Sequence, residues 1–280
     1  MDKIDPKNVR RSVVAGSWYP GTERQLQKTV QGYLDSVEKE KLEGEVIGLI
    51  SPHAGYIYSG QVAAYAYKQL DGVSYDVVAV ISPVHRVPLG RFAITSAAAY
   101  ETPLGLVQLD GELVGALEEK VRINRVSHDG EHSLEIQLPF LQVALEDFCL
   151  LPIMIGESSF EAGEELGTAL AEVLGDKKAL VVASTDLHHI ENYDEVVRRD
   201  KVVVDAIASF DMARIKKALS PWDCSVCGRI PVYAMLTAAR ALGANEVRIL
   251  HYTNSGDVTG IRAPGQYTVG YLAAAIYRGR

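Results

Sequence analysis

EVIGLISPHAGYIYSG, residues 45–60, runs from an apolar segment directly into a histidine. Its apolar part, residues 46–50, is interrupted only by Gly48, which is typical of a strand buried on both faces of a sheet. A Ser-Pro pair ends the run, His53 follows, and Ser59 stands where the N-cap of the next helix is expected. The segment therefore predicts a strand–loop–helix unit with His53 at the carboxyl end of a central strand, where open α/β sheets usually place their chemistry.

The same arrangement occurs twice more along the chain. DVVAVIS at 76–82 is followed by Pro-Val and then His85, and ALVVAST at 179–185 is followed by Asp-Leu and then His188 and His189. Because the carboxyl ends of parallel strands meet at one edge of a sheet, we expect these three strands in one sheet with their histidines at the same edge.

The composition narrows the class of protein. A hydrophobic fraction of 48% and a charged fraction of 23% over 280 residues are typical of a soluble globular protein. The net charge of −8, without a lysine or arginine cluster, disfavours nucleic acid and an anionic membrane surface as partners. The N-terminal segment MDKIDPKNVRR lacks the apolar core of a secretion signal, and three cysteines do not suit a disulfide scaffold. We therefore expect a cytoplasmic protein.

The remaining chain alternates between helical and strand patterns without a linker, repeat or low-complexity segment. The polar residues 121–131 indicate a loop, Pro139 indicates a kink or early break in a mostly helical segment, and Ser158 with Glu161 forms a capping-box pattern. We expect helices at 22–37, 110–120, 158–174, 194–220 (in two pieces around Asp211) and 228–242, and strands at 91–97, 104–110, 246–255 and 266–277, the last with a helical alternative. These patterns predict one α/β domain over residues 1–280, with a central mixed, largely parallel sheet flanked by helices.

His53 and His85 are the strongest pair of candidate metal ligands, since each directly follows a predicted strand. Neutral imidazole is a common ligand for first-row transition metals. If the two strands are neighbours in a parallel sheet, their ends lie about 5 Å apart, within joint reach of one metal ion. The simpler interpretation is that each histidine only caps its loop.

The third histidine-bearing strand end offers an acid–base group. His188 and His189 are adjacent and point in different directions, so at most one of them is expected in the centre of the pocket. We expect His189 to move protons there, oriented by Asp186. The alternative is a polar loop that caps the next helix.

His132 and Glu135 are three residues apart, a spacing that places two side chains on one helix face. They are candidates for metal ligands or for a general-base pair, and the simpler alternative is a solvated first turn. His128 and His251 have no such context and are interpreted as surface or strand residues.

The cysteines divide into a core residue and a CxxC pair. Cys149 lies in an apolar run and is expected in the core. Cys224 and Cys227 form half of a zinc motif with no second half to complete it. Cys227 precedes Gly-Arg at the start of a predicted helix, where backbone amides and Arg229 would stabilise a thiolate. Cys227 is therefore the candidate soft ligand or nucleophile, and Cys224 is expected to be an ordinary thiol.

Six ordered motifs resemble those of the Memo family, whose prokaryotic members are often called AmmeMemoRadiSam system protein B. The resemblance covers about residues 9–278. The motifs are GSWYP (16–20), SPHAGYIYSG (51–60), PVHRVPL (83–89), EHSLEIQLPF (131–140), STDLHH (184–189) and CGRIP (227–231).

The resemblance implies a fold similar to that of class III extradiol ring-cleaving dioxygenases, which use non-haem iron(II). It also implies His53, His85 and Cys227 as the residues that face a metal, with Asp186 and His189 beside them. Eukaryotic members are linked to copper- or iron-dependent redox activity and to binding of phosphorylated receptor tails. The expected cofactor is iron(II) or copper, with zinc as a further option, and the expected ligand is a small molecule or a peptide.

Three functions follow as hypotheses. The first is a redox-active or dioxygenase-like metalloprotein with an open two-histidine, one-cysteine site. The second is a binding module that keeps the pocket but holds a peptide or a partner protein. The third is a hydrolase or acyl transferase with Cys227 as its nucleophile and a histidine as its base.

Overall fold

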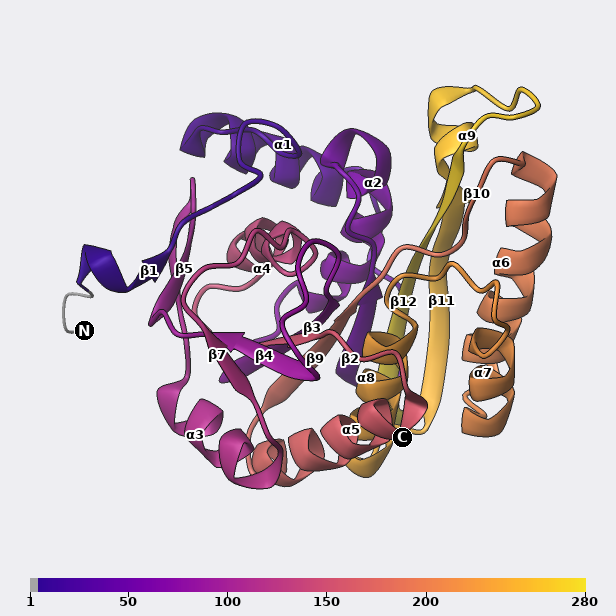
Figure 1. Ribbon diagram of the computed structural model, residues 1–280. Coiled ribbons are helices and arrows are strands. Elements are labelled where there is room, and N and C mark those ends of the chain that lie inside the picture. The colour runs from indigo at the N-terminus through magenta and orange to yellow at the C-terminus, as the bar shows by residue number, and fades with distance from the viewer. Residues whose placement is uncertain (1–4) are drawn as a thin grey trace.

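Four parallel strands form the middle of the molecule in a computed structural model that describes residues 5–280 (Figure 1). The first four residues of the N-terminal segment discussed above lie outside the described residues. The four strands are adjacent in the order β2 (Gly44–Ser51), β9 (Ala179–Ser184), β3 (Val77–Pro83) and β8 (Cys149–Ile155). They bring the chain segments that precede the predicted histidine loops into one sheet.

Mostly antiparallel strands extend this core on both sides, so the prediction of a mixed α/β sheet is confirmed. Beside β2 lies β12 (Thr268–Gly279), which also pairs with β10 (His189–Ile190) and β11 (Glu246–Asn254). Beside β8 lies β4 (Phe92–Thr95), which pairs in parallel with β7 (Asn124–Val126). A separate sheet contains β1 (Val9–Arg10), β5 (Ala99–Thr102) and β6 (Gly105–Gln108).

Helices cover both faces of the large sheet, which explains why its central strands are apolar throughout. On β3, residues 77, 79 and 81 pack into one hydrophobic core, whereas residues 78 and 80 pack into the other. One face is covered by α1 (Glu23–Asp35), α2 (Tyr56–Tyr67) and α4 (Leu138–Ala144), and the other by α3 (Gly111–Lys120), α5 (Phe160–Leu174), α6 (Tyr193–Ala208), α7 (Met212–Leu219) and α8 (Arg229–Ala241) (Figure 1). The short elements are η1 (Pro6–Asn8), η2 (Lys68–Leu70), η3 (Glu135–Gln137) and α9 (Ser255–Thr259).

Several element boundaries differ from the prediction. Helix α2 begins at Tyr56 after Gly55 rather than after Ser59, because the Tyr56 amide donates to the carbonyl of Trp18 (2.8 Å) and so needs no side-chain cap. The cap of α5 is Ser159 instead of Ser158, and Pro139 lies in the first turn of α4, where a proline is tolerated, instead of kinking a helix.

Two further differences arise from pairing between distant strands. The predicted loop at 121–131 contains the short strand β7, which pairs with β4. The C-terminal segment stays extended to Gly279 because β12 has a partner on each side, β2 and β11, so the helical alternative is wrong. No helix among residues 5–280 is long and apolar enough to cross a bilayer.

Candidate metal centre

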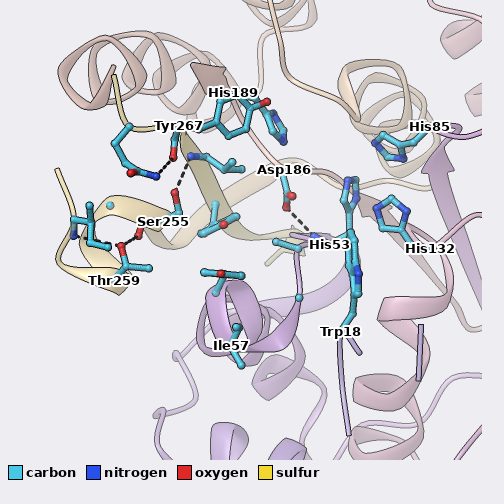
Figure 2. Close-up of a pocket in the computed structure, with 18 of the residues that line it drawn as sticks. Trp18, His53, Ile57, His85, His132, Asp186, His189, Ser255, Thr259 and Tyr267 are labelled. Atoms are coloured by element: carbon cyan, nitrogen blue, oxygen red, sulfur yellow. Dashed lines mark hydrogen bonds between the residues drawn. The ribbon is translucent and has the colours of Figure 1, made fainter. Parts of the chain in front are cut away.

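The carboxyl ends of the central strands open into a cavity of about 690 Å³ (Figure 2). One part of its wall carries titratable groups: His53, His85, His132, Asp186 and His189. The rest of the wall is richer in apolar and aromatic side chains, which include Trp18, Ile57, Tyr58, Ile261, Tyr267, Val269 and Tyr271. The cavity therefore joins a cluster of imidazoles to a surface suited to an apolar ligand.

His53 and His85 meet although their strands are not neighbours. Strand β9 lies between β2 and β3, so the condition that the two strands are neighbours is not met. The loops that follow the strands bridge this gap, and the two imidazole rings lie 5.1 Å apart between centroids in an edge-to-face arrangement.

A serine at the end of β9 orients His53. Ser184 Oγ donates to the carbonyl of Ser133 and accepts a hydrogen bond from Gln137 Nε2 (2.7 Å). Its remaining contact is with His53 Nδ1 (2.9 Å), so Ser184 is the acceptor and His53 Nδ1 carries the proton. This tautomer leaves His53 Nε2 with a free lone pair. Burial lowers the pKa of His53 well below its ordinary value, and the neighbouring imidazoles act in the same direction.

A buried glutamate orients His85. Glu131 Oε1 lies 3.0 Å from His85 Nδ1, and the same carboxylate accepts hydrogen bonds from the backbone amides of His85, His132 and Ser133. Burial opposes ionisation of Glu131, but the hydrogen bonds from His132 and His85 hold its pKa below the usual range. The carboxylate therefore accepts the Nδ1 proton and leaves His85 Nε2 for a metal ion.

Cys227 completes a set of three donors. Its Sγ lies 3.1 Å from His53 Nε2, and the ligand atoms of His53, His85 and Cys227 all lie within 4.8 Å of one another. Two imidazole nitrogens and one sulfur at this separation suit a single transition-metal ion with an open coordination position. The structure thus brings together the three residues predicted to face a metal.

The predicted stabilisation of a Cys227 thiolate by a helix end is outweighed, because the hydrogen bond from the Gly228 amide lowers the pKa of Cys227 less than burial raises it. Helix α8 begins at Arg229 with Gly228 as its cap, and the Arg229 guanidinium donates to the carbonyl of Leu219 (3.4 Å). Burial and the nearby Asp186 carboxylate raise the pKa of Cys227. A cation in the cavity would supply the positive charge that the thiolate needs.

Asp186 and His189 both face the cavity, but they do not form the predicted pair. Asp186 Oδ1 accepts a hydrogen bond from the backbone amide of His53 (2.8 Å), and burial raises its pKa (Figure 2). His189 is held by Ser225, whose Oγ accepts from the His189 amide (2.9 Å) and whose carbonyl lies 3.1 Å from Nδ1. Because that carbonyl accepts the Nδ1 proton, His189 Nε2 is left free.

His132 and Glu135 are separated by the structure. His132 lines the cavity, with its ring 4.3 Å from the Trp18 ring and 4.8 Å from the His85 ring between centroids (Figure 2). Glu135 does not line the cavity. It is fully buried and accepts hydrogen bonds from the N-terminal segment, including the amide of Val13 and the hydroxyl of Tyr19. The spacing argument fails because only Glu135 lies in η3, and the chain turns between the two residues.

The other candidates fall outside the cavity. His188 points away from it, with Nδ1 2.8 Å from Asp200, in line with the prediction that adjacent histidines diverge. His128 is exposed, and His251 on β11 stacks on Tyr65 at 4.3 Å.

Sequence reasoning missed the residues that hold the imidazoles. Glu131, Ser184 and Ser225 each accept a hydrogen bond from a histidine Nδ1. All three lie within or beside the motifs quoted above, and this position could have marked them as residues of the site. Nothing in the sequence pattern, however, relates Ser225 to His189, 36 positions away.

Known proteins match this sequence over most of its length. A family model described as Memo-like protein matches residues 10–275. A MEMO1 family protein from Methanosarcina mazei is 37% identical over 272 residues, which cover 96% of this chain and 99% of that protein. MEMO1 family proteins from Nitrosopumilus maritimus and Aquifex aeolicus are each 34% identical, with 90% of this chain and 94% of each protein covered.

A solved structure is similar in fold. The crystal structure of the uncharacterized protein JW3007 from Escherichia coli K12 matches with a TM-score of 0.53 and 12% identity, covering 81% of this chain and 99% of that one. At this identity the likeness concerns the fold alone.

Proposed function

Because this chain belongs to the family of Memo-like proteins, we propose that its cavity is a transition-metal centre and that the protein is a metal-dependent oxidoreductase. His53, His85 and Cys227 are the proposed ligands. The observation that carries the proposal is their convergence: three donor atoms lie within 4.8 Å of one another while both histidines have their other ring nitrogen engaged. Such partners fix the tautomer and orientation of metal-binding imidazoles.

The donor set narrows the choice of metal. Two imidazoles with one thiolate suit copper or zinc and accept iron(II), whereas a hard oxygen-rich set would suit magnesium or calcium. When bound, iron(II) or copper would supply electron transfer to or from a ligand in the cavity. We propose iron(II) or copper as the functional metal, with zinc as a competing occupant. The three free cysteines fit a reducing compartment, which supports a cytoplasmic location.

The chain's own side chains would orient the ligand and move protons. His189 presents a free Nε2 to the cavity because Ser225 accepts its Nδ1 proton, so it can accept or donate a proton there. Asp186 fixes the His53 loop through the backbone. Trp18 and Tyr267 add aromatic walls against which an apolar or aromatic small molecule would pack.

A second candidate function is peptide binding. Apolar side chains at the cavity are unusually exposed, and Ile57, with 75% of its surface accessible, is the most exposed of them. Ile261 and Tyr267, each about half exposed, lie at the same cavity. A peptide or a partner protein could cover this rim while one of its side chains enters the pocket.

Metal analysis tests the first proposal. Protein purified without chelator, and protein reconstituted without oxygen with iron(II), copper(I) or zinc, is analysed by inductively coupled plasma mass spectrometry. We expect about one equivalent of a transition metal in the wild type, a loss of it in His53→Ala and Cys227→Ser, and full retention in the matched controls His251→Ala and Cys149→Ser. If the wild type binds none of these metals, or the ligand variants bind as well as the controls do, the metal centre is refuted and peptide binding becomes the leading function.

A further inference from the structure

His85 is the least buried of the three proposed metal ligands, and it lies on the irregular connection between β3 and β4. Its side chain is 30% accessible, whereas His53 is buried. Within residues 5–280, both hydrogen bonds that hold His85 go to Glu131. The His85 amide donates to Oε2 (2.5 Å), and Nδ1 donates to Oε1 (3.0 Å). The orientation of this ligand therefore depends on the position of Glu131.

Glu131 also lies outside regular secondary structure, in the connection between β7 and η3. Arg10, on β1, reaches this connection from the N-terminal segment. Its Nη2 donates to the carbonyl of Glu131 (2.5 Å) and to Asp129 Oδ1 (2.7 Å). Asp129 Oδ1 in turn accepts a hydrogen bond from the Glu131 amide (3.1 Å). Arg10 therefore holds the Glu131 backbone both directly and through Asp129.

The Arg10 guanidinium uses all five of its N–H donors. Besides the two bonds from Nη2, Nε donates to Asp129 Oδ2 (3.4 Å), and Nη1 donates to Glu135 and to the carbonyl of Arg11 (3.2 Å). Only 6% of Arg10 is exposed. A lysine would keep the charge, but its three donors on a flexible stem cannot reproduce this planar fork. The contacts therefore require an arginine and not only a positive charge.

The small sheet fixes Arg10 itself. Strand β1 pairs in parallel with β5, so that Arg10 lies opposite Tyr100. The guanidinium carbon lies 5.1 Å from the centre of the Tyr100 ring, within the range of a cation–π contact. The side chain thus connects an ordered sheet to an irregular connection that would otherwise have fewer anchors.

Other residues hold the remaining two ligands. His53 is bonded to Ser184 and to Asp186, and the amide of Asp186 donates to Cys227 Sγ (3.2 Å). Both partners lie at or directly after the end of β9. A change at Arg10 should therefore alter His85 more than His53, which makes His53 a control within the same molecule.

We propose that Arg10 is a positioning residue of the metal centre. It holds the connection that carries Glu131, and Glu131 sets the orientation and the tautomer of His85. The proposal rests on the proposed function of His53, His85 and Cys227 as metal ligands. Residues that orient a metal-binding histidine in this way typically change metal affinity by about 10–100-fold.

Zinc affinity, measured in competition with a chromophoric chelator, tests whether Arg10 acts through Glu131. We expect Arg10→Lys and Glu131→Gln each to weaken zinc binding about tenfold. The double variant should bind no more than about twofold more weakly than Glu131→Gln alone, because the two residues act in one path. Arg11→Lys, the matched control at the exposed neighbouring residue, should bind like the wild type.

Two results of this titration would overturn the proposal. One is wild-type affinity in Arg10→Lys, and the other is a pair of independent losses that multiply to about a hundredfold in the double variant. A wild type that binds no zinc would instead count against the metal centre itself, and the role of Arg10 is then decided on the metal-free protein.

The tautomer of His85 in the metal-free protein is a readout independent of any metal. It is measured by NMR of the ring nitrogens in protein labelled with ¹⁵N-histidine, and His85→Gln identifies the His85 signals. In the wild type we expect the proton on Nδ1 of both His85 and His53. In Arg10→Lys, His85 should lose this preference while His53 keeps it, whereas a general loss of structure would alter both.

A second variant covers the case in which Arg10→Lys does not fold. Asp129→Asn keeps the Arg10–Glu135 pair and should change the His85 tautomer in the same way. A His85 tautomer that stays as in the wild type in the folded variants would overturn the proposal. A wild-type His85 without a proton on Nδ1 would overturn it whether or not the variants fold.

Discussion

Hydrogen bonds at the single-residue scale already prepare the imidazoles for a metal ion. Ser184 and Glu131 accept the Nδ1 protons of His53 and His85, so the Nε2 of each histidine carries the lone pair that a metal ion would use. Such partners reduce the reorganisation needed on metal binding. Cys227 is the exception, since burial raises its pKa and the thiolate gains its stability only with a cation beside it. The sulfur is therefore the donor whose removal is most informative.

We expect Cys227→Ser to weaken copper binding at least tenfold, roughly 1.4 kcal/mol, because a hydroxyl is a poor replacement for a soft thiolate. Cys224→Ser should change copper binding little, since Cys224 is not among the converging donors. Titration calorimetry with copper(I) measures both variants. Equal losses in the two variants would indicate a site shared by both cysteines, and no loss in either would remove Cys227 from the ligand set.

His189 is expected to act on protons rather than on the metal, because Ser225 holds its ring and it is not among the three converging donors. His189→Ala should therefore keep about one equivalent of metal while oxygen consumption by the copper-loaded protein with ascorbate falls. His53→Ala should lose both. Metal content and an oxygen electrode give the two readings, and loss of metal from His189→Ala would show that the roles are assigned wrongly.

At the scale of elements, the proposed metal centre depends on the contact between the start of α8 and the end of β9. A Cβ on Gly228 would lie 2.4 Å from Thr185 Cβ and 2.5 Å from the carbonyl oxygen of Ser184. Only glycine allows α8 to approach this closely, and the approach places Cys227 beside His53.

Gly228→Ala should therefore push α8 away from β9. We expect the free energy of unfolding to fall by about 1–3 kcal/mol, and we expect metal binding to weaken in the same variant. Gly115→Ala in α3 is the matched control, since its Cβ would meet no atom within 4 Å. The control should be neutral or more stable by about 0.5–1 kcal/mol. Urea denaturation measures the stability of each variant, and its metal content is measured separately. A Gly228→Ala protein with wild-type stability and wild-type metal content would contradict the role of this contact.

A second contact between elements fastens the N-terminal segment beside the cavity. Glu135 accepts hydrogen bonds from the amides of Val13 and Val14 and forms an ion pair with the buried Arg10. The same segment carries Trp18 into the cavity wall. Glu135, predicted as a catalytic group, is therefore a structural residue that holds the segment carrying Trp18.

Glu135→Ala should cost about 1–3 kcal/mol, because it leaves Arg10 with Asp129 as its remaining ion-pair partner and removes the acceptor of the Val13 and Val14 amides. The exposed pair of Arg11 and Glu101 provides the control, and Glu101→Ala should cost less than about 1 kcal/mol. Urea denaturation gives the two values, and hydrogen exchange should show residues 9–19 losing protection in the first variant only. Similar costs for the two variants would be inconsistent with a buried anchor.

At the scale of the whole molecule, stability should depend on pH through the His188–Asp200 pair. The pKa of His188 is raised to about 9 in the folded protein, above its ordinary value. The stabilisation is therefore fully present below a pH of about 6.5 and is lost as the pH rises through about 9. Its size is up to about 3 kcal/mol, from a difference of roughly 2.5 pKa units.

Urea denaturation of the wild type and of His188→Gln at pH 6 and at pH 9.5 measures this linkage. The stability advantage of the wild type over the variant should be large at pH 6 and should shrink at pH 9.5. An advantage that stayed constant or grew with pH would contradict the pairing. The exposed His128 provides the control variant, His128→Gln, which should show no such change.

The amino-acid sequence by itself determined the class of fold and the edge at which chemistry gathers. Buried strands are local features, and residues 46–50, 76–82 and 179–184 carry enough apolar residues to be recognised without knowledge of their neighbours. A histidine soon after each run is therefore placed at the sheet edge by chain continuity alone. Cys227, which lies far from the other donors in sequence, was selected by its place before a predicted helix and again by the ordered motifs.

Tertiary structure alone decided which groups meet at that edge. Strand β9 lies between β2 and β3, and Ser225 rather than Asp186 holds His189. Glu135 binds the N-terminal segment, and His188 pairs with Asp200. Periodicity records which side of a strand or helix is buried, but it does not record which distant polar group satisfies a buried one. Those partners are selected when the elements pack, because each buried donor or acceptor must find a hydrogen bond within the space that packing leaves.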